Sequence, residues 1–227
     1  MRGVLVLVVD SSTPAVTAAV AEVTADGVAL RAERQTINAR AHGELLAPQI
    51  DAVLDETGAR PRDLAAIVAG VGPGPFTGLR VGLVTAASMG QVLGVPTYGV
   101  CSLDALGLAA GGRRILAATD ARRREVYWAV YDRDGQRLAG PAVDAPAAVA
   151  DQAKELEVEF AVGEGALRYA ELLGLPVRPE PVHPPAHALA ELAADRVRRR
   201  APTERLTPLY LRRPDAVAAT TRKSVLR

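Results

Sequence analysis

Residues 70–82 read GVGPGPFTGLRVG. They connect the apolar run at residues 64–71, which is typical of a buried strand, to a helical pattern at residues 79–93. A strand, a glycine-rich loop and a helix in this order indicate an α/β protein. Four residues are expected to shape the loop. Gly72, Gly74 and Gly78 give its backbone conformational freedom, and Thr77 is expected to cap the helix.

The same loop has the features of an anion site, because the N-terminus of a helix attracts negative charge. It is not a Walker A loop, since no Gly-Lys-Ser/Thr follows, and its prolines do not fit the dinucleotide-binding fingerprint. A rigid turn that packs the helix against the sheet needs no ligand. We therefore predict a structural loop and keep phosphate binding as the alternative.

The chain opens with three predicted strands. The β-branched run at residues 4–9 indicates a strand buried on both faces. Strand character resumes at residues 15–23, Asp26-Gly27 is a hairpin signal, and alternation returns from Val28 to Ala32. These features predict an antiparallel meander.

The turn after the first strand carries four polar residues, Asp10, Ser11, Ser12 and Thr13. In actin-like ATPases, a hairpin of this kind approaches the nucleotide phosphates. Hydroxyl and N–H groups bind phosphate oxygens, and a carboxylate holds Mg²⁺ through water. The alternative, which we favour, is a turn whose side chains satisfy the local backbone.

The remaining pattern alternates helices and strands. We expect a helix at residues 41–57 that stops at Gly58, a strand at 96–100 and a helix at 103–110. The second half repeats this order less clearly, which suggests a duplicated βββαβαβ unit and the actin/Hsp70/sugar-kinase fold. Its predicted elements are strands at 114–120, 126–131, 136–139, 159–162 and 207–213, with helices at 146–156, 166–173 and 186–200.

This order divides the chain into an N-terminal lobe at residues 1–110, a degenerate C-terminal lobe at 111–213 and a loosely ordered tail at 214–227. The 27 basic and 26 acidic residues give a net charge of +1, so no whole-molecule field attracts nucleic acid or membrane. The single cysteine, Cys101, cannot form an internal disulfide. No apolar run is long enough for a signal peptide or membrane helix, so we expect a cytoplasmic protein.

Several motifs together resemble the TsaB (YeaZ) family. They are the opening Asp10-Ser11-Ser12, His42 before a leucine-rich helix, GPGPFTGLR at residues 72–80, SLDAL at 102–106 and PLYLR at 208–212. The resemblance spans nearly the whole chain and is strongest over residues 4–110.

This resemblance implies two actin-like lobes and a role in making N6-threonylcarbamoyladenosine beside the anticodon of tRNAs that read ANN codons. It also implies that the chain does not transfer the group itself. Family members pair with the catalytic paralogue TsaD, the ATPase TsaE joins them, and tRNA is bound through the complex.

The catalytic paralogue carries His-x-x-x-His, and two imidazoles at that spacing share a helix face and bind one metal. The corresponding positions here are Ser102 and Leu106, which do not form such a site. We therefore expect no catalytic residues, no metal and no cofactor. The alternative is a self-sufficient actin-like ATPase or kinase, or a metallopeptidase-like enzyme.

The helices at 41–57 and 79–93 are the predicted partner surface, as the resemblance implies. A helix on a sheet needs only one apolar stripe, so about half of the apolar positions are expected to be core. The same faces would allow a homodimer when the partner is missing. The predicted contact residues are Leu45, Leu46, Gln49, Ile50, Val53, Arg80, Val84 and Ser88.

Two basic clusters complete the sequence-based expectations. One is Arg122-Arg123-Arg124, and the other comprises ten Arg or Lys residues from Arg196 to Arg227. Solvated surface charge is the simpler interpretation, and contact with tRNA phosphates is the alternative.

Overall fold

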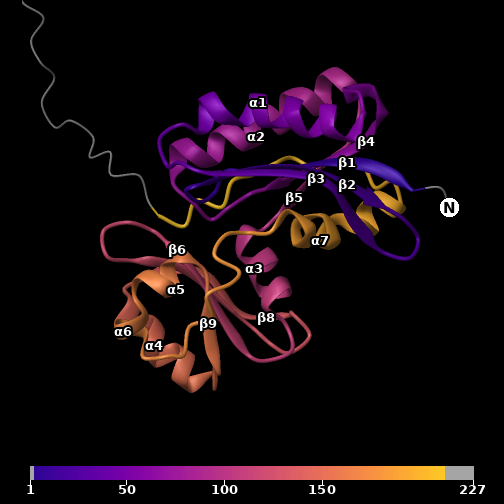
Figure 1. Cartoon of the computed structure of the whole chain (residues 1–227). Helices are drawn as coiled ribbons and strands as arrows, with labels where there is room; N and C mark the ends of the chain where they lie inside the picture. Colours follow the sequence, from indigo (N-terminus) through magenta and orange to yellow (C-terminus); the bar gives the residue numbers. More distant parts are fainter. Residues whose placement is uncertain (1–2, 213–227) are drawn as a thin grey trace, which may run out of the picture.

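The computed structural model describes residues 3–212 and consists of two sheets with helices around them (Figure 1). The first sheet has the strand order β3-β2-β1-β4-β5. β1, β2 and β3 are antiparallel, as predicted, and β4 and β5 add in parallel. The strands are β1 (Val4–Asp10), β2 (Ala15–Val23), β3 (Val28–Ile37), β4 (Leu64–Gly70) and β5 (Thr97–Val100).

Helices cover both faces of this sheet, which explains why β1 is apolar from Val4 to Val9. Leu7 and Val9 pack in one core with α1 (His42–Thr57) and α2 (Phe76–Leu93). Val6 and Val8 pack in a second core on the opposite face, under α7 (Ala186–Arg198). Figure 1 shows α1 and α2 on the outer side of the sheet and α7 between the sheet and the second lobe.

The second sheet repeats the first with one strand fewer, in the order β8-β7-β6-β9. β6 and β9 are parallel, and a single bridge between Ala161 and Val177 stands where a fifth strand would lie. The second lobe therefore has the same topology in a reduced form. Its elements are β6 (Ile115–Asp120), β7 (Val126–Tyr131), β8 (Arg137–Asp144), α4 (Pro146–Glu155), β9 (Phe160–Val162), α5 (Glu164–Arg168) and α6 (Ala170–Leu173).

The helix α3 (Ser102–Ala110) connects the two lobes. Its Ala105 belongs to the core beneath α7, whereas Leu103 and Leu106 belong to the core of the second sheet. A Cβ on Gly107 would collide with the Tyr131 ring, so this glycine lets α3 approach β7 closely. The two lobes thus share one buried helix.

The structure corrects four sequence-based predictions. The helix expected at 166–173 is split into α5 and α6 at Tyr169. The strand expected at 136–139 extends to Asp144. Residues 207–212 form no strand, although the Leu209 N–H donates to the Val71 carbonyl at 2.9 Å. Phe76, rather than Leu79, begins α2.

The helix α7 does not pack in the lobe to which the sequence-based division assigned it. α7 follows the second lobe in sequence, yet it packs on the first sheet with Leu189, Ala190 and Ala193 fully buried. The boundary at residue 110 therefore describes chain order, not the packing of α7. The tail expected at 214–227 lies outside the described residues. Within residues 3–212, no helix has the length and apolar character needed to cross a bilayer.

Candidate functional site

The turn after β1 is built around the buried carboxylate of Asp10. Its Oδ1 accepts hydrogen bonds from the Ser12 N–H at 2.9 Å and the Ser12 hydroxyl at 2.8 Å. Its Oδ2 accepts the Ser102 hydroxyl at 2.6 Å. Burial raises the pKa of Asp10 above its ordinary value, while the hydrogen bonds from Ser102 and Ser12 oppose that rise.

Ser11 ties the same turn to α2. Its hydroxyl donates to the Gly78 carbonyl at 2.8 Å and accepts the Gly82 N–H at 2.9 Å. Thr13 accepts the Ala15 N–H at 3.2 Å, as expected of a local Ser/Thr turn. The four polar side chains are thus bonded within the protein, the arrangement that the structural alternative predicts, and nucleotide binding by them stays a prediction.

The glycine-rich loop lies directly against this turn. A Cβ on Gly74 would collide with the Ser12 carbonyl, and one on Gly78 would lie 3.0 Å from the Ser11 carbonyl oxygen. Gly72 has a φ of 90°, a region that favours glycine. The Nε2 atom of His42, the first residue of α1, lies 2.9 Å from the Thr13 carbonyl. The loop therefore joins β1, α1 and α2 at one point.

Thr77 does not cap α2, contrary to prediction. The N-cap residue is Pro75, no side chain caps the helix, and Thr77 is exposed in its first turn. The prolines before Phe76 keep the chain extended until the helix begins, so the helix starts ahead of Thr77.

Ser102 and Leu106, the positions predicted to correspond to the paralogue's histidines, take part in the packing of the protein. The Ser102 hydroxyl accepts the Gly72 N–H at 3.3 Å in addition to its bond with Asp10. Leu106 is fully buried in the core of the second sheet. Among residues 3–212, no group of three or more His, Cys, Asp or Glu side chains is arranged to hold a metal ion.

The predicted partner residues divide between core and surface. Leu46, Ile50 and Val53 pack into the core against the sheet. Gln49 is buried and donates to the Thr36 hydroxyl at 2.8 Å, and Leu45 is half-buried. The residues of the predicted set that are exposed are Arg80, Val84 and Ser88.

Those three exposed residues belong to a continuous row on α2, which we call the α2 ridge. It consists of Phe76, Arg80, Val84, Ser88 and Val92, spaced four residues apart and all exposed. Val84 is 62% exposed and Val92 85%. Residues at this spacing form one ridge of a helix, the feature that packs into the grooves of another helix. The spacing could have identified Phe76 and Val92, which the sequence-based prediction missed.

Tyr210, from the far end of the chain, extends the α2 ridge. Its ring centroid lies 5.0 Å from that of Phe76, and its hydroxyl accepts a hydrogen bond from Arg80 Nε at 3.0 Å. The Arg80 guanidinium carbon lies 3.7 Å above the Phe76 ring. Exposed Tyr, Arg and aromatic side chains in contact are typical of the energetic centre of protein interfaces.

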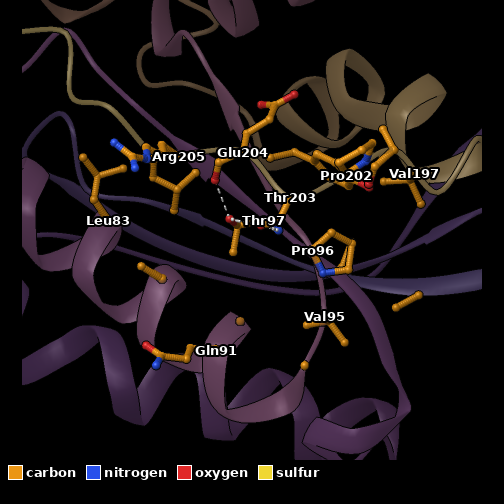
Figure 2. A pocket seen from close by; sticks show the side chains of 18 of the residues that line it. Leu83, Gln91, Val95, Pro96, Thr97, Val197, Pro202, Thr203, Glu204 and Arg205 are labelled. Atoms are coloured by element: carbon orange, nitrogen blue, oxygen red, sulfur yellow. Dashed lines mark hydrogen bonds between the residues drawn. The ribbon is translucent and has the colours of Figure 1, made fainter.

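A groove of about 1240 Å³ runs beside the α2 ridge. Figure 2 shows Leu83 and Gln91 of α2 on one side, and Pro202, Thr203, Glu204 and Arg205 on the other. The Glu204 N–H donates to the Thr97 carbonyl at 2.9 Å, which fixes this segment along β5. Ridge and groove together form a convex and a concave element on one side of the molecule.

Comparison with known proteins agrees with this architecture. Residues 36–202 match the family model of TsaD, tRNA N6-adenosine threonylcarbamoyltransferase. The solved structure of YeaZ from Pseudomonas aeruginosa is 28% identical, with a TM-score of 0.76, and the match covers 92% of this chain and 100% of that one.

The chain belongs to the TsaB (YeaZ) family. The TsaB protein of Escherichia coli, named a tRNA threonylcarbamoyladenosine biosynthesis protein, is 34% identical over 142 residues, covering 59% of this chain and 62% of that protein. An uncharacterised protein of Mycobacterium tuberculosis is 49% identical, covering 93% of each chain. Membership in the TsaB family confirms the predicted actin-like fold with two lobes of related topology.

Proposed function

We propose that this chain is a non-catalytic partner of a TsaD-type transferase in the formation of N6-threonylcarbamoyladenosine beside the anticodon of tRNAs that read ANN codons. The pathway is supported by the names of the relatives, which are threonylcarbamoyladenosine biosynthesis proteins. The partnership is supported chiefly by one observation, the exposed α2 ridge with Phe76, Val84 and Val92.

The physical argument for a partner rests on the apolar content of the α2 ridge. Exposed valines and a phenylalanine in one row lose contact with water when a second helix covers them, which is favourable by about 25 cal/mol per Å² of apolar surface. The groove beside the ridge would receive side chains of the same partner. Arg80 and Tyr210, already held in contact, lose little side-chain freedom on binding.

The non-catalytic role is supported by the residues at the paralogue's metal positions. Ser102 is engaged in two buried hydrogen bonds, and Leu106 is part of a closed core. Recruiting either to a reaction would disrupt the contact between the lobes. The ATPase TsaE and the tRNA would join through the TsaD-type partner, in the cytoplasm, and the chain alone could self-pair through the α2 ridge.

Two substitutions test this function. Val84→Arg and Val92→Arg together place charge on the α2 ridge and should weaken the complex with the TsaD-type protein of the same organism by at least about tenfold, since central interface residues contribute about 2 kcal/mol or more. Light scattering after size-exclusion chromatography measures the complex, and nucleoside mass spectrometry measures the modified adenosine.

Leu172→Arg with Leu138→Arg is the matched control, because these leucines are 57% and 46% exposed on α6 and β8, away from the α2 ridge. It should leave complex and modification unchanged. Wild-type complex formation by the ridge variant would refute the partner surface. Threonylcarbamoyl transfer by the isolated chain would refute the non-catalytic role and favour the self-sufficient enzyme.

A further inference from the structure

A second cavity, of about 740 Å³, lies between the two lobes. We call it the interlobe cleft. One wall comes from residues 39–43 after β3 and residues 75–78 at the start of α2. The opposite wall comes from the β6–β7 turn at residues 122–124 and from α5 with Tyr169. Its volume suits a small ligand or a few units of a polymer.

Arginines from three separate segments meet at this cleft. Arg40 comes from the first lobe, Arg122–Arg124 from the β6–β7 turn and Arg168 from α5, and all five are exposed. The cleft lining thus carries five arginines against two carboxylates, a local excess of positive charge in a chain whose net charge is only +1. Converging guanidinium groups are the usual partners of phosphate, which they bind through two parallel N–H···O bonds.

Two carboxylates, Asp120 and Glu164, also line the interlobe cleft, and they offset only part of this charge. Asp120 accepts hydrogen bonds from Arg168 Nη1 at 3.2 Å and from the Tyr169 hydroxyl at 3.2 Å, so its charge offsets that of Arg168. The pKa of Glu164 is raised to about 7, mainly because the carboxyl is buried and secondly because the charge of Asp120 lies nearby. Glu164 is therefore only partly ionised near neutral pH.

The β6–β7 turn holds its arginines in a fixed and unusual backbone. The φ angles of Arg122, Arg123 and Arg124 are 61°, 52° and 63°, a region where glycine and asparagine are more common. The Glu125 N–H donates to the Arg122 carbonyl at 3.0 Å, and the Ala121 N–H to the Glu125 carbonyl at 3.0 Å. These hydrogen bonds hold the turn, and Arg122 and Arg124 line the interlobe cleft from it with exposed side chains.

We propose that the interlobe cleft binds a chain of phosphate groups, supplied either by a free polyphosphate or by an RNA backbone. Arg40 would contact it from the first lobe, and Arg122 and Arg124 from the second. The α2 ridge and the interlobe cleft share only Phe76, and the arginines proposed to bind phosphate lie outside the ridge. This inference therefore goes beyond the proposed function and does not depend on it.

The test uses the full chain with Arg122→Asn and Arg124→Asn, since asparagine tolerates the left-handed backbone. The matched control is Arg62→Asn with Arg133→Asn, two exposed arginines outside the interlobe cleft that give the same change in charge. Isothermal titration with inorganic tripolyphosphate probes the free ligand. Fluorescence anisotropy with a synthetic single-stranded RNA, at several salt concentrations, probes the polymer.

The cleft variant should bind at least one probe about tenfold more weakly than wild type, since each charge-assisted hydrogen bond contributes about 1.5–3 kcal/mol. If RNA is the source, the slope of log affinity against log salt should fall by about 1.4, or about 0.7 for each lost phosphate contact. The control variant should bind both probes as tightly as wild type does. The probe whose binding the cleft variant loses shows whether the phosphates come from a free polyphosphate or from RNA.

Two results would overturn the proposal. One is the absence of binding of either probe to wild type, and the other is an equal loss in the cleft variant and its control. Complex formation with the TsaD-type protein, measured in parallel, would remain intact in either case, so a failure here leaves the proposed function standing.

Discussion

Ser102 begins α3 and places its hydroxyl between the Asp10 carboxylate and the Gly72 N–H. It joins the end of β1, the glycine-rich loop and the helix shared by both lobes. Asp10 is 1% exposed, so a hydrogen bond lost here would not be replaced freely by water. A small hydroxyl therefore holds this junction together.

Ser102→Ala should lower the free energy of unfolding by about 1–3 kcal/mol, because it leaves a buried acceptor and a buried donor without this partner. Urea denaturation followed by circular dichroism measures the change. Ser88→Ala, on the exposed α2 ridge, is the control and should stay within about 0.5 kcal/mol of wild type. Equal stability of the two variants would show that the Asp10 junction contributes nothing.

At the scale of the element, α2 has two rows of opposite character. Its exposed row is the α2 ridge, and its buried row, also spaced by four residues, consists of Gly78, Gly82, Ala86 and Gly90. A Cβ on Gly82 would lie 2.5 Å from Ser11 Oγ, and one on Gly90 would lie 2.5 Å from Thr97 Cγ2. The small residues let the helix approach the sheet, and this closeness fixes which row faces outward.

Gly82→Ala should destabilise the protein by about 1–3 kcal/mol, although alanine is the better helix former, because the methyl group would displace the Ser11 hydroxyl. Gly43→Ala in α1 is the matched control, since no atom lies within 4 Å of its added Cβ. It should be neutral or stabilising by up to about 1 kcal/mol. Thermal or urea denaturation compares the two, and stabilisation by Gly82→Ala would contradict close packing of α2.

At the scale of the whole molecule, the end of the chain completes the first lobe. α7 covers Val6 and Val8, and its Arg196 donates to the Gly99 carbonyl at 3.0 Å and to Glu204 at 2.8 Å. Beyond it, Leu209 and Leu211 pack against the core of the second sheet. The first sheet is therefore closed on its inner face only when the chain returns from the second lobe.

A fragment of residues 1–110 should fail to fold, because without α7 the inner face of the first sheet is exposed to water. Joining residues 186–206 to this fragment through a flexible linker should restore a cooperative thermal transition, measured by circular dichroism. A cooperative transition of fragment 1–110 alone, near that of the full chain, would contradict this view of the first lobe.

The sequence by itself determined the order of strands and helices in the first lobe, and it carried the motifs of the family. Strand alternation, the turn signal at Asp26-Gly27 and the helix stop at Gly58, which has a φ of 64°, are local features that act over a few residues. Only the tertiary structure decided which residues meet at the turn after β1. Asp10 and Ser102 are 92 residues apart, and no periodicity predicts that they meet. Likewise, both rows of α2 contain apolar or small residues, so burial against the sheet, rather than composition, decides that Val84 and Val92 face outward.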